Sequence, residues 1–119
     1  MAFSINVTPI ESRLHVVANG DAGLPEFIGL ADLVGAIARG NRLRKVLIDL
    51  LGVHPQLAFT EHLQLGTHLG RLAEDFDRVA TVVPASRRTG ASEKAAQKTG
   101  IGLRTFTDPG AAIDWLNGD

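Results

Sequence analysis

Alternating apolar and polar residues at the start of the chain predict two strands. Phe3, Ile5 and Val7 alternate with polar residues, which is the period of a half-buried strand. A turn over residues 9–12 leads to a second predicted strand at 13–18, and so short a connection predicts an antiparallel hairpin. Residues 19–23, which include Gly20 and Gly23, are expected to form a loop.

The pattern then changes to a helical period and back to a strand. Apolar residues at three- and four-residue spacing predict a helix over residues 25–40; they are Phe27, Leu30, Val34 and Ile37. Pro25 suits the first turn of a helix and Gly40 its end. Residues 45–50 form a short, continuous apolar run, which is typical of a strand covered on both faces. We expect a loop from Leu51 to Phe59.

The second half of the chain repeats this alternation of helix and strand. A helix is expected to open near Thr60, the candidate N-cap, with an apolar stripe that comprises Leu65, Leu69, Leu72 and Phe76. The remaining predicted elements are a strand at 78–83, a basic loop at 86–90, a short helix at 91–99, a strand at 103–106 and a terminal helix that Asp108 caps. The order is β-β-α-β-α-β-α-β-α. It predicts an α/β fold, with a mixed, mostly parallel sheet of about five strands, one antiparallel edge strand and helices on both faces.

Composition narrows the functional classes. The chain has 119 residues, which suits a single domain over residues 1–119. Its net charge of −1 gives no overall attraction to nucleic acid, and it has no cysteine for disulfides or thiol chemistry. No signal peptide or transmembrane segment is expected, so a cytoplasmic location is the default.

Three parts of the chain follow the pattern of a known family; they are residues 16–21, residues 45–50, and residues 78–83 together with 106–116. These segments resemble the STAS domain, in particular its SpoIIAA-like bacterial branch, which is related in fold to CRAL-TRIO domains. The resemblance implies a STAS-like fold and a module that binds a partner protein. Regulatory STAS domains carry a phosphorylatable Ser or Thr in an Asp-Ser-Ser-Gly-like segment soon after the third strand. Here residues 51–60 contain no serine, and their only hydroxyl belongs to Thr60. Thr60 is therefore a candidate phosphosite, although capping is the favoured interpretation.

The carboxyl ends of parallel strands are the usual ligand sites of α/β sheets. The residues expected to line this edge are Asp49, His54, Ser86, Arg87 and Arg88. They predict a site for an anionic or amphipathic ligand, with the two arginines on the negative group. The alternatives are that Asp49 accepts backbone N–H groups in a turn and that the arginines form a solvated loop.

No catalytic residue, metal site or cofactor is predicted. His62 and His68 lie six residues apart on one helix, a spacing unsuited to a shared metal, and no Gly-x-Ser-x-Gly motif is present. Some apolar residues could form either a tightly packed core or an apolar cleft or dimer face. They are Phe27, Ile28, Leu30, Leu33, Leu57 and Phe59.

Three functions are compatible with these residues. The first is a non-enzymatic STAS-like module that binds a partner protein or a small amphipathic or anionic ligand at its strand-end loops and that could form a homodimer. The second is a phosphorylation-responsive regulator of the anti-sigma-antagonist type that uses Thr60 or Ser86. The third is a small hydrolase or isomerase.

Overall fold

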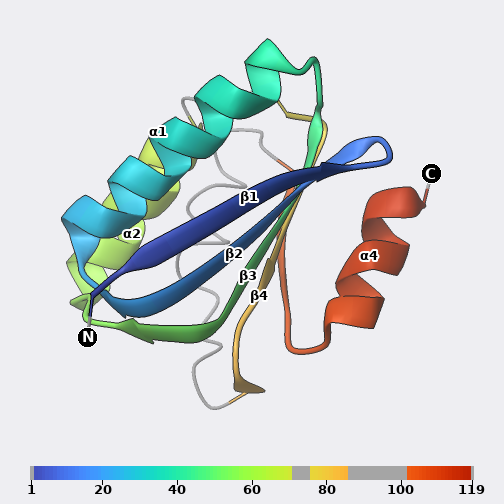
Figure 1. Ribbon diagram of the computed structural model, residues 1–119. Coiled ribbons are helices and arrows are strands. Elements are labelled where there is room, and N and C mark those ends of the chain that lie inside the picture. The colour runs from blue at the N-terminus through green and yellow to red at the C-terminus, as the bar shows by residue number, and fades with distance from the viewer. Residues whose placement is uncertain (1, 71–75, 86–101, 119) are drawn as a thin grey trace.

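The computed structural model describes residues 2–70, 76–85 and 102–118 (Figure 1). The helices and strands are β1 (Ser4–Ile10), β2 (Arg13–Ala22), α1 (Leu24–Gly40), β3 (Lys45–Pro55), α2 (Phe59–Gly70), β4 (Arg78–Val82), β5 (Leu103–Phe106) and α4 (Pro109–Asn117). The helix predicted at 91–99, the basic loop at 86–90 and Leu72 lie outside the described residues.

The strands form one five-stranded sheet in the order β1-β2-β3-β4-β5. β1 and β2 form an antiparallel hairpin, and β2 to β5 are parallel. The predicted mixed, mostly parallel α/β sheet with one antiparallel edge strand is therefore confirmed.

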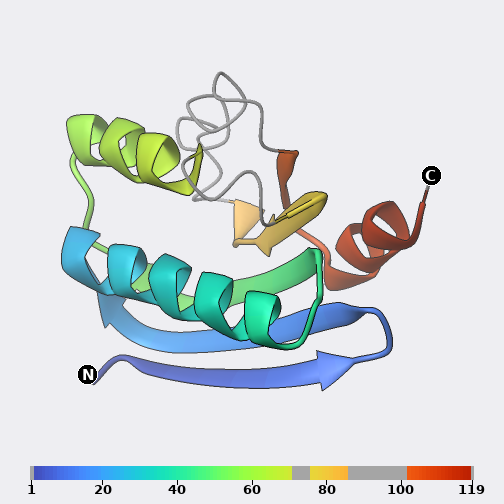
Figure 2. The ribbon, with the colours of Figure 1, turned by 90° about the horizontal axis from the view of Figure 1, so that it is seen from above.

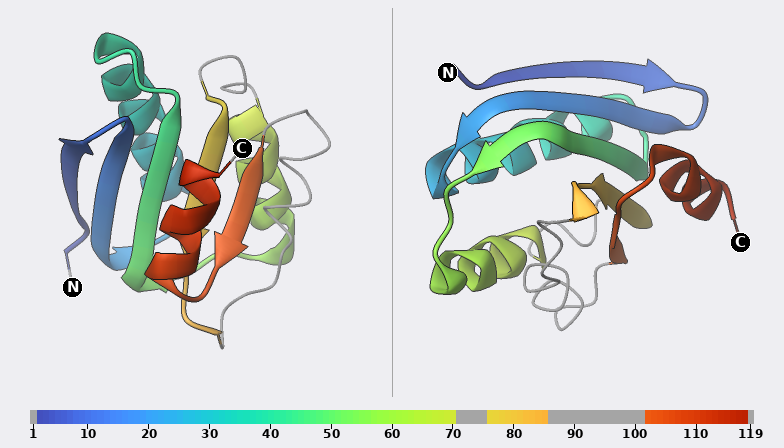
Figure 3. Two further views of the ribbon diagram at one scale, coloured as in Figure 1. Left: turned by 90° about the vertical axis from the view of Figure 1, so that its right-hand side faces the viewer. Right: turned by 90° about the horizontal axis from the view of Figure 1, so that it is seen from below.

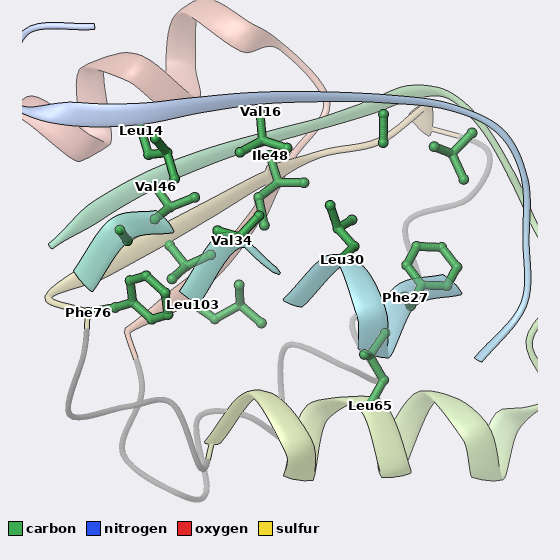
Figure 4. Packing of buried hydrophobic residues seen from close by; sticks show 14 of the residues in the cluster. Leu14, Val16, Phe27, Leu30, Val34, Val46, Ile48, Leu65, Phe76 and Leu103 are labelled. Carbon is green, nitrogen blue, oxygen red and sulfur yellow. The ribbon is translucent and has the colours of Figure 1, made fainter. Parts of the chain in front are cut away.

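Helices lie on both faces of the sheet (Figures 2 and 3). α1 and α2 cover one face, where they bury side chains of alternate strand positions such as Val16, Val46 and Ile48 (Figure 4). α4 packs on the opposite face. There Ala112 and Leu116 bury Leu47, Ala80 and Val82. This division follows from the two-residue period of strands, which sends neighbouring side chains to opposite faces.

α4 covers only part of its face. It packs against β3, β4 and β5. Among the described helices, none lies over the same face of β1 and β2 (Figure 3). No helix in the described part of the chain is long and apolar enough to cross a bilayer.

Two strands are longer than the sequence predicts. β2 continues to Ala22 and β3 to Pro55, so most of the loops expected at 19–23 and after Leu50 belong to the sheet. Their register shifts between Val17 and Asn19, after which Asp21 pairs with His54. Each extended strand supplies backbone hydrogen-bond partners to the other. The sequence pattern of either segment alone does not predict this pairing.

Candidate functional site

The carboxyl edge of the sheet joins two strand ends to two helix starts. The backbone N–H of Gln56 donates to the carbonyl of Ala22 at 2.8 Å, which ties the exit of β3 to the exit of β2. α1 begins two residues after Ala22, and α2 begins four residues after Pro55. In Figure 1 both helices start at the same end of the molecule. This edge is the location at which the sequence predicts a site.

A glutamate at the third position closes the first turn of each helix. Glu26 Oε1 accepts the backbone N–H of Gly23 at 2.8 Å, and Glu61 Oε1 accepts that of Ala58 at 2.9 Å. Each carboxylate also lies at the positive end of a helix dipole. The expectation that Thr60 is the N-cap is wrong, because α2 begins at Phe59 and the turn closes on Ala58.

Thr60 instead lies exposed in the first turn of α2. Its hydroxyl makes no hydrogen bond to the residues that the structure describes. An added phosphate at this position would face solvent beside a helix N-terminus. Glu61 is the nearest negative charge along the chain.

Asp49 lies within β3 and not at its exit. Its Oδ1 accepts the backbone N–H of Leu51 at 2.9 Å, where β3 shifts register against β2. The structure thus shows Asp49 in the role of backbone acceptor, although in a strand irregularity and not in a turn.

The prediction that His54 lies in a loop is wrong, because His54 belongs to β3. Its Nδ1 is 3.8 Å from Oδ1 of Asp21, the residue opposite it on β2. The His54 and Asp21 side chains are 55% and 44% exposed, so this contact is a surface ion pair when the imidazole is protonated. The sequence predicts a loop at Asp21, and its pairing with His54 follows only from the strand register.

The remaining predicted site residues, Ser86, Arg87 and Arg88, lie outside the described residues. The structure therefore places three of the six candidate residues, Asp49, His54 and Thr60, on β3 and at the start of α2.

An exposed aromatic side chain stands at this edge. Phe59 is 70% exposed in the first turn of α2, and Leu63 one turn later is 40% exposed. Leu51 of β3 is 41% exposed. By contrast, Phe27 and Leu30 of α1 are buried, so the apolar residues that the sequence groups together divide into core and surface.

The charges described at this edge are negative. Its segments, residues 19–26 and 51–61, carry Asp21, Glu26 and Glu61 and contain no lysine or arginine. The described part of this edge therefore combines exposed apolar side chains with several carboxylates.

The chain is similar to known proteins in fold more than in sequence. No protein-family model and no curated protein matches the chain. Among solved structures, an uncharacterized protein of the DUF3478 family with a SpoIIAA-like fold from Shewanella loihica PV-4 is 22% identical with a TM-score of 0.61. The match covers 96% of this chain and 93% of that one.

Two anti-sigma factor antagonists also superimpose on the chain. One, from Mycobacterium paratuberculosis, has a TM-score of 0.66 at 14% identity, and the match covers 98% of this chain and 96% of that one. The other, SpoIIAA in its unphosphorylated form, has a TM-score of 0.58 at 10% identity and coverages of 98% and 100%. The chain therefore has a SpoIIAA-like fold, as its resemblance to STAS domains implies.

Proposed function

We propose that the chain is a non-enzymatic, cytoplasmic module that binds a partner protein through the carboxyl edge of its sheet. The observation that carries this proposal is Phe59, an aromatic side chain that is 70% exposed at the start of α2. Aromatic residues that become buried on association contribute much of the binding energy at protein interfaces.

The surroundings of Phe59 indicate the character of the partner. Asp21, Glu26 and Glu61 are the acidic residues of the two described segments, 19–26 and 51–61, that meet at this edge. We therefore expect a partner with an apolar pocket for Phe59 and with basic side chains that face these carboxylates. Charges of opposite sign on the two surfaces would orient the partner and speed association.

The fold neighbours support the same class of function. Two of them are described as anti-sigma factor antagonists, proteins named for their action on another protein. The chain's likeness to them is one of fold, so the identity of its own partner has to be determined by experiment.

Site-specific photo-cross-linking in the cells that make the protein tests this proposal. A cross-linking residue replaces Gln56, which is exposed at the carboxyl edge, or Asp114, which is exposed on α4. We expect the cross-linking residue at position 56 to capture a specific protein that the cross-linking residue at position 114 does not capture. No capture at Gln56, or the same capture at both positions, would refute the proposed surface.

A matched pair of variants then tests the anchor with the purified partner. Phe59→Ser should weaken the complex at least about tenfold. Leu33→Ser removes a leucine that is 44% exposed on α1 and should leave the affinity within about twofold. Equal effects of the two substitutions would mean that Phe59 is not the anchor.

Phosphorylation at Thr60 is a second candidate function. The supporting observation is that Thr60 is exposed at the start of α2 without a capping role. SpoIIAA, which shares the fold, has structures in unphosphorylated and phosphorylated forms.

Mass spectrometry of protein isolated from its own cells tests this second function. We expect an increment of one phosphoryl group that Thr60→Ala removes and Thr67→Ala retains. Thr67 is the matched control, because it is exposed on the same helix but its hydroxyl donates to the carbonyl of Leu63. An unmodified wild-type protein under every growth condition would exclude the switch.

Two alternatives to a partner protein are a small amphipathic ligand and a homodimer, and each predicts a different mass for the native protein. An apolar cavity between α1 and the sheet, lined by residues such as Val34, Ile48 and Leu103, has room for little more than one water molecule. This small volume favours a partner protein over a ligand carried in that cavity. Native mass spectrometry of the gently purified protein separates the three cases by mass.

A further inference from the structure

Three cationic residues stand side by side at the opposite, amino edge of the sheet. Arg13 of β2 is the register partner of Lys45 of β3, which is in turn the register partner of Arg78 of β4. Register partners share a face of the sheet. Arg78 contacts Trp115 of α4, so this face is the one on which α4 lies. We call these three residues the cationic row.

The row is electrostatically unfavourable by itself. Adjacent strands are about 4.8 Å apart, and like charges opposite each other on neighbouring strands destabilise a sheet. The segments next to the row add to its positive charge, because residues 10–14, 42–45 and 76–79 contain more basic than acidic residues. The basic ones are Arg13, Arg42, Arg44, Lys45 and Arg78, and the acidic ones are Glu11 and Asp77.

The carboxylates of the described residues neutralise the row only in part. Arg13 is 9% exposed, yet its buried Nε has no hydrogen-bond partner among the described residues, and its Nη1 is 3.6 Å from the exposed Glu11 carboxylate. Asp77 is engaged with Arg44 at 2.9 Å. Lys45 is half-buried and forms no ion pair with a described residue.

Arg78 shows how the row is held in place. Its Nη1 donates to the carbonyl of Trp115, and its guanidinium lies 5.1 Å from the centre of the Trp115 ring. The negative end of the α4 dipole therefore stabilises one cation and fixes its orientation. A guanidinium has five N–H donors, so Arg78 can still bind a further acceptor.

From these observations we infer that the cationic row is a binding site for a phosphoryl group carried by a small molecule. Arginine guanidinium groups match the geometry of phosphate oxygens, and lysine adds a point charge. The row spans about 10 Å across three strands, which suits a compact anion with more than one negative charge. A bound phosphoryl group would bring the negative charge that the row lacks among the described residues, and it would relieve the repulsion within the row.

This site is independent of the proposed partner surface, because it lies at the other end of the strands. Calorimetric titration of the full chain with inorganic pyrophosphate tests it. We expect saturable binding that Lys45→Gln and Arg13→Gln each weaken about tenfold, since each removes a charge-assisted contact. Arg39→Gln is the matched control. It removes one positive charge at the same end of the molecule but on helix α1, and it should change the affinity less than about twofold.

Thermal unfolding shows that the variants are folded. Without ligand, Lys45→Gln should unfold no lower than the wild type, because it relieves repulsion between like charges. Pyrophosphate should raise the unfolding temperature of the wild type but not that of Lys45→Gln.

Vesicles distinguish the source of the phosphoryl group. The wild type could bind phosphatidylcholine vesicles that contain phosphatidic acid, lose this binding in Lys45→Gln, and not bind pyrophosphate. This result would overturn the small-molecule assignment in favour of a lipid headgroup. Absence of binding to both probes would overturn the site. Equal weakening by Arg39→Gln and Lys45→Gln would overturn it as well, because it would indicate only general charge attraction.

Discussion

The imidazole Nε2 of His68 lies 2.7 Å from Oδ1 of Asp32, which joins α2 to α1. The His68 side chain is 23% exposed and that of Asp32 is 57% exposed, so the contact is at the rim of the helix pair. Because Phe59 and Thr60 belong to α2, this contact helps to position the proposed partner surface.

We predict that a double-mutant cycle on this pair gives a coupling free energy of about 0.2–1 kcal/mol, the range measured for exposed ion pairs. The variants are Asp32→Asn, His68→Gln and their combination, and the measurement is urea unfolding. A coupling energy indistinguishable from zero would show that the contact does not hold the two helices together in solution.

Glycine at position 20 should be indispensable for stability. Gly20 has φ of 109°, and a Cβ there would lie 2.1 Å from the backbone oxygen of Ala2. We expect Gly20→Ala to lower the free energy of unfolding by at least about 1–3 kcal/mol, because both the conformation and the backbone contact oppose a side chain.

Gly29→Ala is the control for that substitution and should change the free energy of unfolding in the opposite direction. Gly29 lies within α1, and a Cβ there would meet no other atom within 4 Å. Alanine should raise the free energy of unfolding by about 0.5–1 kcal/mol through its higher helix propensity. Chemical denaturation of both variants gives the comparison, and a stable Gly20→Ala protein would contradict the close approach of the N-terminal segment.

Leu47 should control the docking of α4. It is fully buried against Ala112 and Leu116, so Leu47→Ala should cost about 2–5 kcal/mol. Leu33→Ala removes the same atoms from a side chain that is 44% exposed and should cost less than about 0.5 kcal/mol. Trp115 is the chain's one tryptophan and lies on α4, so its fluorescence reports the transition. Equal losses in both variants would show that α4 does not bury Leu47 in solution.

Local signals account for the elements that the sequence predicts well. The alternation of Phe3, Ile5 and Val7 marks β1, and Asp108 accepts the backbone N–H of Ala111 at 3.0 Å as the predicted cap of α4. The apolar spacing from Phe27 onward marks α1, whose buried face matches that prediction at Phe27, Leu30 and Val34.

The candidate site was predicted less completely. The carboxyl edge follows from the strand order, but His54 was expected in a loop, and its contact with Asp21 arises from an extended pairing of β2 with β3. The N-cap expected at Thr60 rests on residue preference, whereas the first turn of α2 closes through Glu61 on Ala58, which is not a capping residue by type.

Residues near each other in the sequence determined the element types, because hydrophobic period and helix-terminal residues act over a few positions. The order of these elements along the chain then predicted the mostly parallel sheet. Only the tertiary structure decided which distant side chains meet. Arg13, Lys45 and Arg78 form one row, although each is more than thirty residues from the next along the chain. Strand register brings these cations together, and register depends on how whole strands pair and pack, which no single segment encodes.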